Sequence, residues 1–125
     1  GDSTGVDMSL LEEKPDEGKG DEIFRIVEQM PEFPGGEKEL FSYLSKNIRY
    51  PAMARENGIS GRVILTFIVN KEGKISDVQV LRGIGGGCDE EAIRVVKSMP
   101  QWKPGKQTGL PVAVQFNLPV NFKLL

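Results

Sequence analysis

Histidine is absent from this chain of 125 residues, and cysteine occurs only once, at Cys88. The lack of histidine removes the commonest general base and the commonest metal ligand. A single thiol forms no disulfide within the chain and no cysteine-rich zinc site. The residues therefore give no support for catalysis, and we expect a binding protein that is not an enzyme and has no cofactor or metal.

The chain also lacks a long apolar run and an excess of basic residues. No stretch approaches the ~20 apolar residues that span a bilayer. The net charge of −2 argues against nucleic acid as a partner, because such binders usually carry a basic surface. With 38% hydrophobic and 27% charged residues, the composition is that of one ordinary packed domain.

The first 21 residues differ in composition from the rest. Residues 1–21 contain seven acidic residues, two lysines and four glycines, with almost nothing to bury. Such a segment cannot offset the entropy cost of ordering, so it is predicted to be a disordered linker. The domain is then expected over residues 22–125, with a lead-in segment at 22–36 and a core at 37–125.

Periodicity and turn residues predict the order of elements in the domain. A four-residue repeat of Leu40, Leu44 and Ile48 is typical of an amphipathic helix, and Tyr50-Pro51 interrupts it. The patterns predict a short strand within 22–27, helices over 37–47 and 51–57, strands over 61–69 and 75–82, a helix over 89–98, a loop over 106–110 and a strand over 112–124. This order indicates an α+β fold in which a three-stranded antiparallel sheet packs against two to three helices.

The last predicted strand has the clearest pattern in the chain. Seven apolar residues alternate with small or polar ones from Val112 to Leu124, so one face is expected in the core and the other in water. Pro119 cannot donate to a ladder and belongs on an edge strand or at a bulge. If the strand at 61–69 is central, the last strand leaves its outer edge open. Residues 22–27 could cover that edge, two chains could pair there, or an extended peptide could add to it as a strand.

A glycine-rich loop at 83–87 precedes Cys88 and lies between a predicted strand and a predicted helix. It resembles a phosphate-binding loop, but no Gly-Lys-Ser/Thr follows it, and acidic residues stand where a phosphate would bind. A flexible connector is the better interpretation. The same acids and the lack of a histidine base favour a structural role for Cys88. The neighbouring carboxylates of Glu90 and Glu91 are interpreted as solvated surface charge.

Several short motifs, in order, resemble the C-terminal domain of TonB energy transducers. They are Tyr50-Pro51 with Ala52, Ala54 and Arg55, then residues 58–61 (GISG) before a strand, Gly73-Lys74-Ile75, Asp89 with Ala92, residues 102–105 (WKPG) and the alternating last strand. The resemblance covers about residues 31–125. Pro34-Gly35-Gly36 and the Pro-Val start of the last strand resemble the version found in Bacteroidetes.

The resemblance implies a periplasmic domain of a protein anchored in the inner membrane by a region outside this chain. Such domains dock the TonB box, an extended segment of outer-membrane transporters, by strand addition, and they transmit energy from a proton-driven inner-membrane motor complex. The positions that correspond to the contacts of the family are Asn47, Ile48, Arg49, Tyr50 and Pro51 before the second helix, and Val112, Ala113, Val114, Gln115, Phe116, Asn117 and Leu118 on the last strand. Many family members have Gln-Pro-Gln before Tyr-Pro, whereas this chain has Asn47-Ile48-Arg49.

Two alternatives stay open at this point. The domain could belong to a membrane-bound sensor or peptidase that carries a TonB-like module. It could also be a self-associating structural module that pairs its last strands in a homodimer.

Overall fold

The computed structural model describes residues 22–124, and the predicted linker at 1–21 lies outside this part of the chain. The main sheet has the order β2-β6-β3-β4, and β5 pairs with β6 beside this path. The strands are β2 (Ile23–Phe24), β3 (Gly61–Val69), β4 (Ile75–Arg82), β5 (Gly105–Gln107) and β6 (Leu110–Phe122). The predicted α+β fold is confirmed, with β3 in the centre of an antiparallel β6-β3-β4 sheet.

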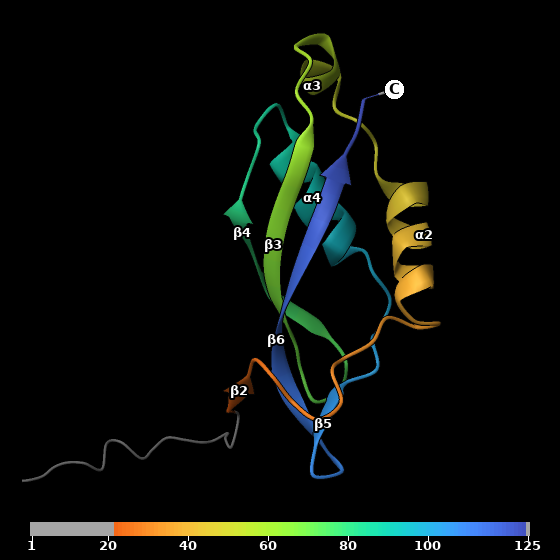
Figure 1. Ribbon diagram of the computed structural model, residues 1–125, viewed down its shortest axis with the longest axis vertical. Coiled ribbons are helices and arrows are strands. Elements are labelled where there is room, and N and C mark those ends of the chain that lie inside the picture. The colour runs from red at the N-terminus through yellow and green to blue at the C-terminus, as the bar shows by residue number, and fades with distance from the viewer. Residues whose placement is uncertain (1–21, 125) are drawn as a thin grey trace, which may run out of the picture.

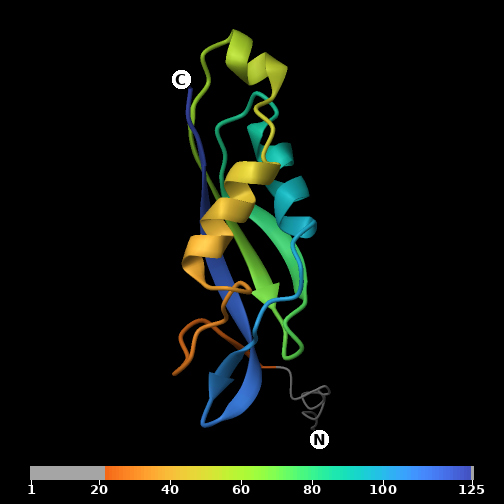
Figure 2. The same ribbon diagram turned by 90° about the vertical axis from the view of Figure 1, so that its right-hand side faces the viewer.

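Three helices accompany the sheet: α2 (Glu37–Asn47), α3 (Ala52–Glu56) and α4 (Cys88–Lys97). Figures 1 and 2 show α2 and α4 on one face of the sheet, with α3 beyond its end. Leu40 and Leu44 of α2 and Val95 of α4 are buried, because the apolar stripe of each helix faces the sheet. Among the described residues, none of the helices has the length and apolarity needed to cross a bilayer.

The core is built around the side chains of β3 and one aromatic cluster. Val63, Leu65, Phe67 and Val69 of β3 are fully buried. The indole ring of Trp102 lies between the rings of Phe33, Phe67 and Phe116, with centroids 5.8, 5.6 and 5.2 Å away. These edge-on contacts add specific packing to the burial of a large apolar surface.

The turn between β3 and β4 is fixed against the same tryptophan. Gly73 has φ +86°, and a Cβ atom built on it would lie 1.9 Å from the backbone oxygen of Trp102. The backbone amide of Trp102 also donates to the carbonyl of Gly73, at 2.8 Å. Only glycine fits this position, since a side chain would meet both backbone strain and a collision.

The structure corrects several element boundaries. β6 begins at Leu110 and ends at Phe122, two residues before the predicted end, and Leu124 is 37% exposed. The expected loop at 106–110 instead contains the end of β5 and the start of β6. The helix predicted over 51–57 is α3, with Pro51 as its N-cap, and the helix predicted over 89–98 begins at Cys88 and ends at Lys97. Within 22–27, only Ile23 and Phe24 form a strand.

Candidate functional site

The outer edge of β6 is paired only near its start. β2 runs parallel to β6, and Ile23 and Phe24 are aligned with Ala113 and Val114. β5 pairs with residues 110–112 of β6, off the β2-β6-β3-β4 path, and does not add to the cover of the outer edge. Among the described residues, no strand pairs with the outer edge of β6 from 115 to 122, although β3 pairs with the inner edge along this whole stretch. An open edge of this length is a template for another strand.

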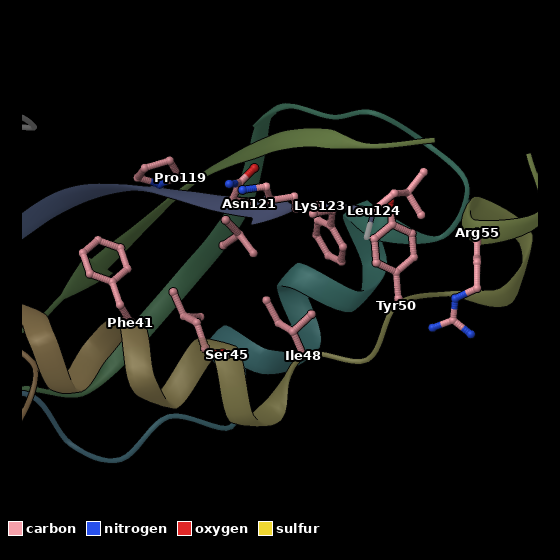
Figure 3. A pocket seen from close by; sticks show the side chains of 12 residues that line it. Phe41, Ser45, Ile48, Tyr50, Arg55, Pro119, Asn121, Lys123 and Leu124 are labelled. Carbon is pink, nitrogen blue, oxygen red and sulfur yellow. The ribbon is translucent and has the colours of Figure 1, made fainter. Parts of the chain in front are cut away.

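A groove runs between this open edge and helix α2. Figure 3 shows Phe41, Ser45 and Ile48 pointing from the helix side toward the C-terminal part of β6. The groove encloses about 670 Å³. Its lining consists of Phe41, Leu44, Ser45, Ile48, Tyr50, Arg55, Pro119, Val120, Asn121, Phe122, Lys123 and Leu124. The ring of Phe41 is 49% exposed, so an apolar side chain of a partner could cover it.

Backbone amides along β6 point alternately toward β3 and toward the outer edge. Pro119 has no amide hydrogen, and proline is tolerated in a strand where its nitrogen faces the open side. The pairing of β3 with β6 is continuous from 114 to 122, so Gln115, Asn117 and Asn121 share the ladder position of Pro119. Their amides are therefore directed to the outer edge. The groove thus combines backbone donors along the edge with an apolar wall from α2.

Tyr50 closes the groove at the end near α3. Its ring meets the ring of Phe122 edge-on, with centroids 5.8 Å apart. Its hydroxyl donates to the carbonyl oxygen of Ile59, and the guanidinium of Arg55 lies 5.7 Å from the ring centroid. Burial is the main cause that raises the pKa of the Tyr50 phenol.

Residues 47–51, which we call the elbow, connect α2 to α3 and are fixed by α4. The Oε2 atom of Glu91 accepts from the backbone amide of Arg49, at 2.8 Å. Arg94 donates from Nη2 to the carbonyl of Asn47, at 2.9 Å, and to Oε2 of Glu91, at 2.7 Å. A second hydrogen bond, from Nε of Arg94 to Oε1 of Glu91 at 2.8 Å, makes the pair bidentate.

Glu91 is therefore not the solvated surface charge that its neighbourhood in the sequence predicts. Its side chain is only 13% exposed. The hydrogen bond from Arg94 is the main cause that lowers the pKa of Glu91, and the amide of Arg49 lowers it further, while burial opposes both. The sequence does indicate the ion pair, because Glu91 and Arg94 are three residues apart on a predicted helix. The contact with the elbow is a tertiary contact that the spacing does not show.

Two cationic side chains stand at the end of the groove formed by the end of β6 and by α3. Arg55 and Lys123 line it, and the lining contains no carboxylate. No salt bridge joins either side chain to another residue in the described part of the chain. An anionic group of a partner would find uncompensated positive charge there.

The structure brings together part of the predicted contact set. Ile48 and Tyr50 line the groove, whereas the side-chain amide of Asn47 donates back to the carbonyl of Tyr43, at 2.8 Å. The other lining residues were outside the predicted contact set, among them Phe41, Ser45, Arg55, Asn121 and Lys123. Phe41 and Ser45 lie on α2, Arg55 on α3, and Asn121 and Lys123 at or directly after the end of β6, so spacing connects them only within each element and not across the groove.

On β6 the predicted stretch is divided. Val112, Ala113 and Val114 already have partners in β5 or β2, while Gln115, Phe116, Asn117 and Leu118 are unpaired on the outer side within the described residues. Gln115 donates from its side-chain amide to the hydroxyl of Thr66, at 3.0 Å, on the sheet face away from the helices. The open stretch extends four residues beyond Leu118, to Phe122.

The glycine-rich loop after β4 is occupied by its own chain. The Oδ1 atom of Asp89 accepts from the amides of Ile84 and Gly85, at 2.9 and 3.2 Å. A Cβ atom on Gly86 would lie 3.0 Å from that of Ala54 on α3. This is a packed loop rather than the flexible connector that its glycines predict. Cys88 beside it is fully buried, and burial is the main cause that raises the pKa of its thiol.

Comparison with known protein families gives a match over the β6 side of the groove, the elbow and α3, but not over most of α2. The model for the Gram-negative bacterial TonB protein C-terminal matches residues 46–124. The chain is 35% identical to Protein TonB of Vibrio cholerae over 79 residues, which is 61% of this chain and 31% of that protein. It is 32% identical to Protein TonB of Pseudomonas aeruginosa over 75 residues, or 60% of this chain and 22% of that protein. The chain thus spans less than a third of the length of these relatives.

Two solved structures have a similar fold. The solution structure of the Helicobacter pylori TonB-CTD (residues 194-285) matches with a TM-score of 0.54 at 25% identity, covering 69% of this chain and 90% of that one. The solution structure of the Pseudomonas aeruginosa TonB CTD matches with a TM-score of 0.50 at 32% identity, covering 62% of this chain and 78% of that one.

Proposed function

The chain belongs to the family of C-terminal domains of Gram-negative bacterial TonB proteins, and from this premise we propose that it is a periplasmic domain that docks the TonB box of outer-membrane transporters. The box adds as a strand to the outer edge of β6 and passes energy from an inner-membrane, proton-driven motor to the transporter. The rest of the protein, outside this chain, supplies the membrane anchor and the contact with the motor. No catalytic step is assigned to the domain.

One observation carries this proposal: the outer edge of β6 from 115 to 122, which no strand covers within the described residues, borders a groove walled by α2. Backbone groups of the edge would bind those of the box largely independently of its sequence. Alternate side chains of the box would rest on Phe41 and Ile48, and this contact would favour apolar residues. Such a site suits one domain that serves transporters with different boxes.

The sheet has a second outer edge, on β4, and it is a poorer docking site. The register of β4 against β3 is irregular in two places, and Asp77 within β4 has φ +53°. Bulges and charged residues are common devices that block edge pairing. β6 pairs with β3 in a continuous register from 114 to 122. Its regular geometry favours it as the docking edge.

The two cations, Arg55 and Lys123, favour a box that carries an acidic residue at the end lying near α3. A carboxylate there would meet positive charge without displacing an existing ion pair. Both side chains are exposed, so the charges would lose only part of their hydration on pairing. The contact is partly exposed, so its contribution to affinity would fall as salt is added.

The proposal is tested by titrating the domain with synthetic peptides that carry the boxes of transporters from the same bacterium, followed by calorimetry. We expect saturable one-to-one binding by at least one box peptide, and none by a scrambled peptide of the same composition. The absence of binding by every box would contradict the proposal. Sedimentation of the free domain separates the self-associating alternative, because strand pairing between two copies would make the mass depend on concentration.

A further inference from the structure

Strand β2 already pairs with the outer edge of β6, in the way proposed for a partner strand. Ile23 and Phe24 lie on the outer edge of β6, parallel to it, and pair with Ala113 and Val114. Ala113 is only 7% exposed although it lies on the sheet face away from the helices, and Ile23 lines the same small hollow as Ala113. The edge opens at Gln115, directly after the last residue that β2 covers.

The chain that follows β2 is held away from the open edge. Gln29 and Lys106 exchange two backbone hydrogen bonds, of 3.1 and 2.8 Å. Glu32 and Lys103 exchange two more, of 3.0 and 2.8 Å. The carboxylate of Glu28 also accepts from the amide of Thr108, at 2.7 Å. These contacts join the lead-in segment to β5 and its turn, so β2 cannot slide along β6 to cover Gln115 and the residues after it.

We propose that β2 is a fixed register stop for the docked strand. This inference rests on the proposed function, since it concerns how the same edge receives its partner, an extended peptide. β2 occupies Ala113 and Val114, so the peptide pairs only from Gln115 onward, and its side chains are brought into line with Phe41 and Ile48 of the groove. A longer peptide gains no further backbone pairing at the β2 end.

The effect is measurable because each backbone hydrogen bond changes affinity about fivefold. Releasing β2 would expose the two residues Ala113 and Val114 to the peptide. A peptide extended at the matching end would then gain about 5- to 30-fold in affinity. A peptide that ends at Gln115 would be unaffected.

The test compares three proteins, each as the full chain. The release variant carries Ile23→Pro and Phe24→Pro, because proline cannot donate to a ladder. Neither residue belongs to the buried core cluster, so the fold should persist. The matched control is Ile26→Ala, which removes an 85% exposed apolar side chain from the same segment without touching a strand pair. Hydrogen exchange at the amide of Ala113, fast in the release variant alone, verifies the release.

The probes are three synthetic peptides: one of eight residues from the box of a transporter from the same bacterium, chosen to match the open stretch 115–122, and the same peptide with three native residues added at its N-terminal or its C-terminal end. We expect the wild type and the control to bind all three equally, and the release variant to bind one extended peptide 5- to 30-fold more tightly. An equal gain in the wild type would overturn the inference. So would no gain in the release variant, or weaker binding of the short box by that variant. If no peptide binds any of the three proteins, the proposed function itself fails, and this inference fails with it.

Discussion

Replacement of Asn117 by proline tests whether the outer edge of β6 forms hydrogen bonds to the partner. Asn117 shares its ladder position with Pro119, which is native, so its amide is directed away from β3. Proline at 117 therefore removes one outward donor while leaving the β3 ladder complete. Asn117 is exposed, so its side chain contributes little to the core.

The size of the effect follows from one lost backbone hydrogen bond. Such a bond contributes about 1 kcal/mol net, which corresponds to a loss in affinity of about fivefold. The proline ring also projects toward the incoming strand, so fivefold is a lower bound. Adding the equivalent Gln115→Pro change removes a second donor, and the two together should weaken binding by about 30-fold or more.

Calorimetric titration with a box peptide measures these losses, and Asn117→Ala is the matched control. Alanine keeps the backbone amide, so its affinity should stay within about twofold of the wild type. Thermal unfolding of each variant checks that the sheet is intact. Equal affinity of the proline and alanine variants, with both folded, would refute the idea that this edge pairs with the partner.

Three further results are expected from the same structure. Glu91→Gln should make the free energy of unfolding depend less on pH. The wild-type carboxylate has a lowered pKa, so its contribution of about 1 kcal/mol is present above pH ~4.3 and is lost as the pH falls through the folded-state pKa. Urea unfolding of both proteins at pH 7 and 3.5 would detect the difference. Lys123→Glu should weaken binding of a box peptide with an acidic residue several-fold at low salt and much less at 1 M salt, whereas a salt-independent loss would exclude an electrostatic cause. Gly73→Ala should cost at least about 2 kcal/mol in unfolding free energy, against about 1 kcal/mol for Gly109→Ala, because both glycines have positive φ but only the first lies against the backbone of Trp102.

The arrangement of the sheet could be predicted from the sequence because each strand carries its own signal. The apolar residues on both faces of β3 indicated a central strand, and the alternation after Val112 together with Pro119 indicated an edge strand. A strand was expected within 22–27, but its reduction to Ile23 and Phe24 was not, and β5 was predicted as a loop. β2 and β5 contain two and three residues, and tertiary contacts rather than periodicity hold them in place.

The groove could be predicted only in part. Tyr50 and Ile48 were identified through a family motif, and the open edge was expected from the position of β6 in the sheet. Phe41 shows why the remainder was missed: it lies beside the apolar stripe of α2, where a sequence pattern predicts an ordinary core residue, yet its ring is half exposed over the groove. Lys123 is a surface lysine in any sequence pattern. It acquires a role only because α3 brings Arg55 to the same end of the groove.

Whether a partner strand binds the open edge of β6 is best decided by amide hydrogen exchange of the domain, measured by NMR with and without a saturating box peptide. We expect the peptide to slow exchange at Gln115, Asn117 and Asn121, whose amides face the open edge, and to leave exchange at Ala113 unchanged because β2 already covers it. Slowed exchange on β4, or unchanged exchange along β6 with the peptide bound, would contradict docking by strand addition at this edge.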